Sequence, residues 1–164
     1  MTMTLLLSLI MMAGLFLMLY SGVGLIQDKR FFTSAPLEVQ NAVTDHSERF
    51  KGAHVLGWVL GALSIGMLVG APVYACYDGI RNGYSFMQIF VRLLIMLWGL
   101  KAFDIIVFDW ILLCNSGFFP HFYPEVKEVL GPHLFGYNRK EHLTHILLSV
   151  PVSLILAAIC TLFQ

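Results

Sequence analysis

Apolar residues occur in four long stretches that are separated by shorter polar intervals. The stretches cover about residues 5–26, 54–77, 85–113 and 142–163. Each is long enough to cross the ~30 Å hydrocarbon core of a bilayer, for which a helix needs about 20 apolar residues. The pattern therefore predicts an all-α integral membrane protein, a four-transmembrane-helix bundle in which residues 1–164 form a single membrane domain.

The polar interval after the first stretch has a helix signal of its own. Ser34, Pro36 and Glu38 are typical of a capped helix start, and apolar residues recur on one side as far as about Phe50. A helix with one apolar face is suited to the surface of a membrane. We therefore expect a short amphipathic helix in this first loop, lying on the bilayer.

Small residues mark the second stretch. Gly57, Gly61 and Ser64 fall on one side of the expected helix, whereas Gly66 and Gly70 fall on nearly the opposite side. Small residues four apart let helix backbones approach closely in lipid. We expect this helix to occupy a central position and its glycine faces to support a homo-oligomer.

Composition strengthens the membrane assignment and excludes one class of partner. Apolar residues make up 58% of the chain and charged residues 12%, against about 25% charged residues in ordinary soluble domains. The mean hydropathy is +0.77. The formal net charge is zero at pH 7, so the chain lacks the basic field that recruits nucleic acid. The lipid bilayer is the expected partner, and nucleic acid is not.

Basic residues between the stretches predict an orientation. Four spans place both termini on one face, with the first and third loops together on the other. By the positive-inside rule the face richer in lysine and arginine is cytoplasmic. We therefore expect a plasma-membrane protein with both termini extracytoplasmic. The two-loop face holds Lys29, Arg30, Arg49, Lys51, Lys127, Arg139 and Lys140, and the other face holds Arg81.

The third stretch carries charges inside an apolar helix. Lys101 and Asp104 are spaced to pair along the helix, which lowers the cost of burying either charge, and Asp109 lies five residues further on. An ionisable side chain within a membrane is a functional candidate. The alternative is a structural ion pair that holds the helix against its neighbours.

Histidines gather at the expected cytoplasmic ends of the helices. His142, His145 and Ser149 recur along one side of the fourth stretch, while His54 begins the second stretch and Asp109 lies at a similar depth. These residues suit a zinc or ferrous ion, with His54, Asp109, His142 and His145 as ligands. The alternatives are hydrogen bonding at the membrane interface and proton transfer.

An aromatic segment, FFPHFYPE at residues 118–125, follows the third stretch. Together with Trp110 it suits an interfacial belt in which Trp110 and Tyr123 lie at headgroup level. The alternative is a lid over a lipid-like substrate or a quinone.

These patterns support three functional hypotheses. The first is a protein that binds or moves a small solute, ion or proton through a polar site between the second, third and fourth helices. The second is a membrane enzyme that acts on a lipid-soluble substrate at the cytoplasmic face, with a metal ion as the candidate cofactor. The third is an accessory subunit of a membrane complex. The candidate site residues are Lys101, Asp104, Asp109, His54, His142, His145 and Ser149.

Overall fold

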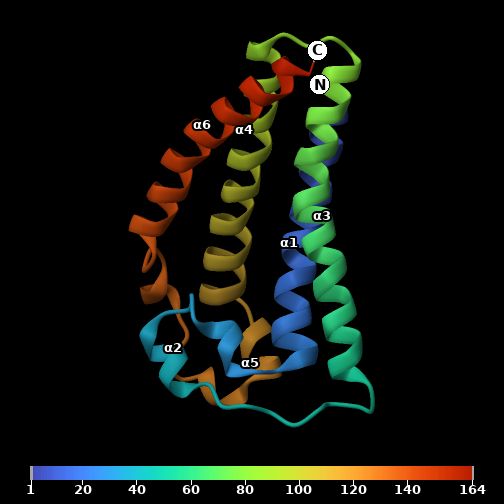
Figure 1. Ribbon diagram of the computed structural model, residues 1–164. Helices are drawn as coiled ribbons and strands as arrows, with labels where there is room; N and C mark the ends of the chain where they lie inside the picture. Colours follow the sequence, from blue (N-terminus) through green and yellow to red (C-terminus); the bar gives the residue numbers. More distant parts are fainter. Residues whose placement is uncertain (1, 164) are drawn as a thin grey trace.

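The computed structural model describes residues 2–163, and within them the chain forms helices and no strand. Four long helical segments run side by side (Figure 1). Their positions agree with the four predicted stretches to within a few residues. They are α1 (Thr2–Tyr20) continued by the π-helix η1 (Ser21–Ile26), α3 (Ala53–Arg81), α4 (Phe86–Phe103) continued by the π-helix η3 (Asp104–Cys114), and α6 (Arg139–Leu162).

Three of these segments are long and apolar enough to cross a membrane: α1 with η1, α3 and α6. The segment formed by α4 and η3 differs from them because it carries the charged side chains predicted for the third stretch. The all-helical part of the fold prediction is thus confirmed, and three of its four spans have the required length and composition.

The two ends of the molecule are built differently. Both termini lie at one end, beside the turn between α3 and α4 (Figure 1). The two long loops meet at the other end and form what we call the loop layer. Its short helices are η2 (Lys29–Phe32), α2 (Leu37–Ala42), α5 (Phe118–Phe122), η4 (Pro124–Val126) and η5 (Pro132–Leu134).

Local sequence explains how the α3–α4 turn is made. Gly83 adopts φ 62°, a left-handed conformation that glycine tolerates without strain. Ser85 then begins α4 with a capping box, in which its hydroxyl accepts from the backbone N–H of Gln88 and the Gln88 side chain accepts from the backbone N–H of Ser85.

Buried side chains form two apolar clusters, one at each end. The cluster at the terminal end lies among the long helices and includes Met11, Ile89, Leu93 and Met96. The loop-layer cluster lies beneath the loops. It contains Val23, Phe32, Val39, Val43, Leu113, Cys114, Phe119, Phe122, Tyr123, Val126 and Leu134.

The short helix predicted in the first loop is present as α2, but it is shorter than expected and part of its apolar face is buried. The observed α2 has six residues and ends before Val43, whose backbone is extended. Val39 and Val43 are buried in the loop-layer cluster rather than presented to a membrane surface. The helix stops early because the following residues, Thr44 and His46, hydrogen-bond to the third loop instead of continuing the helical pattern.

Of the two residues named for the aromatic belt, Tyr123 does not fit the prediction, while the place of Trp110 in a belt stays a prediction. Trp110 is 54% exposed, as a belt residue would be. Tyr123 is fully buried, with its ring packed between Phe32 and His46 at centroid distances of 4.8 and 4.7 Å. Its role is therefore to pack the interior of the loop layer.

Small residues bring α1 and α3 together. A Cβ atom added at Gly57 would lie 2.6 Å from Ile26 Cγ1, and one at Gly14 would lie 2.9 Å from Met67 Cβ. At Gly66 and Gly70, by contrast, an added Cβ would meet nothing within 4 Å. The Gly57 side of α3 thus packs within the chain, while the Gly66 side faces outward.

This difference predicts opposite outcomes for two matched substitutions. Gly57→Ala should lower the free energy of unfolding by about 1–3 kcal/mol, because the new methyl group displaces Ile26 and the backbone beneath it. Gly66→Ala should be neutral or slightly stabilising, since alanine suits a helix better than glycine. Thermal unfolding of the purified variants, followed by circular dichroism, compares them. Equal melting temperatures would contradict the proposed close packing.

Candidate functional site

The candidate site begins where α4 changes into the π-helix η3, at Asp104. In an α-helix Asp104 and Asp109 would point about 140° apart, because five residues exceed one 3.6-residue turn. In a π-helix each residue bonds to the one five positions away, so Asp104 and Asp109 lie on one side. The local geometry therefore directs both carboxylates at α6, where they meet His142.

Four side chains form a continuous polar row between the α4–η3 segment and α6. Lys101 Nζ donates a hydrogen bond to Asp104 Oδ2 at 2.7 Å. His142 Nδ1 lies 3.9 Å from the same oxygen, and His142 Nε2 lies 2.6 Å from Asp109 Oδ2. Asp109 and His142 are buried, at 6% and 7% exposure. We call these residues the polar row.

The charges of the polar row balance only when Asp109 and His142, its two buried residues, hold a proton between them. Lys101 and Asp104 neutralise one another, which leaves Asp109 facing His142. If His142 is neutral, an unbalanced carboxylate is buried, and that is costly. A proton held between Asp109 and His142 removes the imbalance. The pair is therefore a candidate site for a bound proton.

The polar row faces a partly open cavity of about 280 Å³, which we call the inner cavity. Its walls come from η1, η2, α2, α4, η3, α5 and α6, with Leu19 of α1, and no residue of α3 contributes to it. The inner cavity thus differs from the location expected between the second, third and fourth helices, because residues of the first helical segment line it and residues of α3 do not. The polar residues lining the cavity are Ser34, Lys101, Asp104, Asp109, Tyr137, Asn138, Glu141, His142 and His145.

A second hollow, the Trp98 groove, adjoins the inner cavity. It has a volume of about 350 Å³ and shares Lys101, Asp104 and His145 with the cavity. The Trp98 indole N–H donates to the Ser149 hydroxyl at 2.8 Å, which joins α4 to α6. The remaining lining is apolar and consists of Leu15, Leu97, Leu100, Ile146, Leu148 and Val152.

The predicted polar side of α6 is largely present. His142 and Ser149 are buried against the α4–η3 segment, whereas His145 is exposed and lines both hollows. His54 begins α3, where its backbone N–H donates to Glu48, and it does not line the inner cavity.

The structure therefore joins two of the four predicted metal ligands, Asp109 and His142. Across residues 2–163 no group of three or more histidine, cysteine, aspartate or glutamate side chains is arranged to hold a metal ion.

Sequence patterns missed the contribution of Tyr137. Its hydroxyl donates to the Ser34 carbonyl at 2.7 Å, so it closes the inner cavity by joining the two loops. Partial burial, with the negative charges of Asp109 and Asp104, raises the pKa of Tyr137 above its usual range. Tyr137 therefore stays protonated and acts as a donor. It occurs in an irregular loop, where no periodic pattern marks it.

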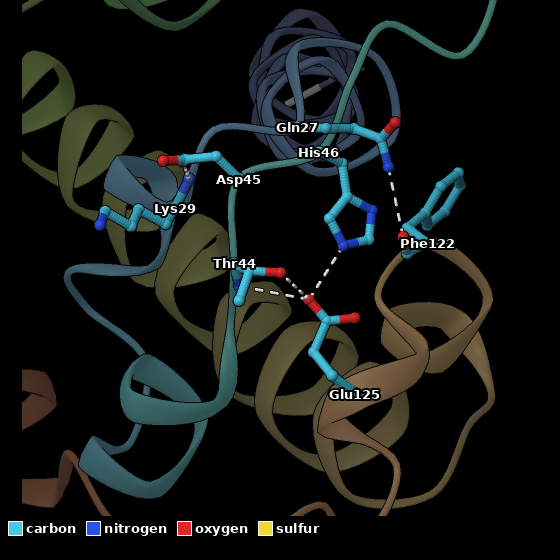
Figure 2. A network of polar contacts seen from close by, with 7 residues as sticks. All are labelled: Gln27, Lys29, Thr44, Asp45, His46, Phe122 and Glu125. Atoms are coloured by element: carbon cyan, nitrogen blue, oxygen red, sulfur yellow. Dashed lines mark hydrogen bonds and ion pairs between the residues drawn. The ribbon is translucent and has the colours of Figure 1, made fainter.

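The loop layer covers this end of the site and is held by a second polar network, shown in Figure 2. Glu125 Oε1 accepts from the Thr44 backbone N–H at 3.2 Å and from its hydroxyl at 2.9 Å, and the His46 Nε2 atom lies 2.9 Å away. Gln27 Nε2 donates to the Phe122 carbonyl at 3.2 Å. These bonds tie the end of the first helix to both loops.

Partial burial raises the pKa of Glu125, but hydrogen bonds outweigh this effect. The donors are the backbone N–H groups of Glu125 and Thr44, followed by the side chains of His46 and Thr44. The net result is a pKa below the ordinary value of 4.5. Glu125 is therefore ionised at neutral pH, and its charge strengthens the network.

Chemically, the site offers a buried acid–base pair, an adjoining cation–carboxylate pair and an apolar groove beside them. It suits proton binding and the binding of a small molecule with a polar end. Comparison of the chain with models of protein families, with curated proteins and with solved structures found no match.

The Glu125 network predicts a pH-dependent contribution to stability. A carboxyl whose pKa is depressed by folding stabilises the fold above its unfolded pKa of about 4.3 and loses that effect as pH falls through the lower, folded pKa. The melting temperature of Glu125→Gln should therefore lie below that of the unchanged protein near pH 7. The difference between the two melting temperatures should become smaller below about pH 4. Glu128→Gln, at an exposed position, serves as the control. A difference in melting temperature that stays the same at every pH would argue against an ionised Glu125.

Proposed function

We propose that the chain is an integral membrane protein whose four long helical segments cross the bilayer. The support is the exposure of its apolar helices. Within the most apolar windows of α1 with η1, α3 and α6, 28%, 17% and 22% of the residues are buried. Soluble monomers rarely expose continuous apolar surface of this extent, whereas lipid would cover it.

The charges of the α4–η3 segment are compatible with a fourth span. Arg92 is 4% exposed, and its Nη1 donates to Asp78 Oδ2 at 2.6 Å, while Lys101 and Asp104 pair with one another. Ionisable residues in a membrane face protein or water and pair with opposite charges. The side chains of this segment follow that rule, so its charges do not need to contact lipid.

The proposed orientation places the loop layer in the cytoplasm and both termini outside, in the plasma membrane. The support is the excess of lysine and arginine in the two loops that meet at this end.

Within this frame, we propose that the polar row is a site at which the protein binds or moves a small solute and at which it also binds a proton. The observation that carries the proposal is the buried Asp109–His142 contact, at 2.6 Å, facing the inner cavity. Its charge balance requires a proton, and histidine exchanges protons near neutral pH. A function in membrane catalysis is the second candidate, because the same acid–base pair lies close to a groove that suits a lipid-soluble substrate.

Histidine NMR tests the proton site. The protein is labelled with ¹⁵N-histidine, and the signal of the His142 ring is identified because it is missing from the spectrum of His142→Gln. This ring should take up a proton as the pH falls. Asp109→Asn removes the negative partner, so the midpoint of that titration should drop by about one to three pH units. The control variant Glu128→Gln should leave the midpoint of the His142 titration unchanged. A His142 ring that does not titrate, or a midpoint unaffected by Asp109→Asn, would overturn the proton-binding proposal.

Labelling of introduced cysteines tests the orientation. A cysteine at Lys51, in the loop layer, should be protected in intact cells from a thiol reagent that cannot cross membranes, whereas a cysteine at Asn82, in the α3–α4 turn, should react. Lysis should make the Lys51 position reactive as well. The reverse pattern would place the loop layer outside the cell.

A further inference from the structure

One nitrogen of the polar row has no hydrogen-bond partner within the described part of the chain. His142 Nδ1 is buried and makes no hydrogen bond, although His142 lines the inner cavity. When His142 is neutral and its hydrogen lies on Nε2, facing Asp109, Nδ1 is a hydrogen-bond acceptor. A buried acceptor without a donor costs free energy. A ligand with an N–H group that reached Nδ1 from the inner cavity, which His142 lines, would satisfy this acceptor.

The nearest polar atom cannot fill this role. Asp104 Oδ2 lies 3.9 Å from His142 Nδ1, which is too long for a hydrogen bond, and it is an acceptor as well. A group that bridges two acceptors must donate two hydrogens. A protonated amine does so, and its positive charge offsets the negative charge that a neutral His142 leaves unbalanced on Asp109.

The charge around the inner cavity favours a cation over an anion. With both histidines neutral, the carboxylates outnumber the single ammonium group of Lys101 among the described residues that line it. The segments η1, η2, α2 and α5 contribute no ionisable side chain to its wall. Arg139 and Lys140 line a separate hollow, which shares Asp109 and His142 with the inner cavity. The titratable lining residues are Lys101, Asp104, Asp109, Tyr137, Glu141, His142 and His145.

The Trp98 groove supplies a place for an apolar body. It meets the inner cavity at Lys101, Asp104 and His145, and its far wall is formed by apolar residues that include Val152. A molecule with its amine beside Asp104 and His142 would extend its hydrocarbon part into this groove. Both halves of the ligand then have matched surroundings.

We propose that the solute of this site is an amphiphilic amine, held as its ammonium form between His142 Nδ1 and Asp104 and exchanged against the proton of His142. The inference rests on the proposed function and adds the chemical class of the solute. A protonated His142 carries hydrogen on Nδ1 and repels the ammonium group, so the proton and the amine exclude one another.

Equilibrium dialysis of the full-length protein in lipid nanodiscs tests this with radiolabelled hexylamine, corrected for empty nanodiscs. Saturable binding is expected for hexylamine and not for hexanol or hexanoate, which share its chain. Binding should weaken about tenfold per pH unit once His142 is protonated, because one proton is exchanged. Equal uptake of the three compounds, or hexylamine binding that is insensitive to pH, would overturn the proposal.

Variants locate the two halves of the ligand. Asp104→Asn should weaken hexylamine binding at least about tenfold, as expected for loss of a charged hydrogen bond, while Glu128→Gln should not. Val152→Phe, which fills the groove from a partly exposed position, should weaken binding of hexylamine but not of methylamine. If Asp104→Asn does not fold, Val152→Phe still tests whether hexylamine binds at this site. Hexylamine binding unchanged by Val152→Phe would refute the assigned place of the hydrocarbon chain.

The two proposals fail in different ways. If His142 titrates in the NMR experiment but hexylamine does not bind, the amine assignment is wrong and the proton site stands. If His142 does not titrate, the proposed function is wrong whatever hexylamine does.

Discussion

The structure depends on one constraint: charges placed among apolar helices must find partners within the chain. Asp109 and His142 meet this constraint by sharing a hydrogen bond at 2.6 Å, and Lys101 and Asp104 meet it one helical turn away. These contacts decide how η3 lies against α6. The inner cavity lies beside these contacts.

The long helices were predictable because their signal is local and repeated. Some twenty apolar residues in a row identify a helix whatever it contacts, and the i, i+3 spacing of Lys101 and Asp104 correctly indicated their pairing. The repeat of His142 and Ser149 likewise identified the buried side of α6. Each of these predictions needed only one segment of the chain and the geometry of an ordinary helix.

The rest of the site depends on features that no periodic pattern records. The π-helical geometry of η3 changes which residues share a side, so Asp104 and Asp109 meet the same histidine although α-helical spacing separates them. The loop layer depends on contacts between residues about eighty positions apart, such as Thr44 with Glu125. Such contacts end α2 early and bury Tyr123, and neither result follows from local propensity.

The π-helix also bears on how distant relatives of this chain would be recognised. In η3, two carboxylates five residues apart face one partner, and in an ordinary α-helix the same direction is reached by carboxylates four residues apart. Loss of a single residue between Asp104 and Asp109 would thus exchange one helix type for the other while preserving the acidic face toward His142. A sequence signature for this site should accordingly accept either spacing, and require a histidine near the start of the last helix.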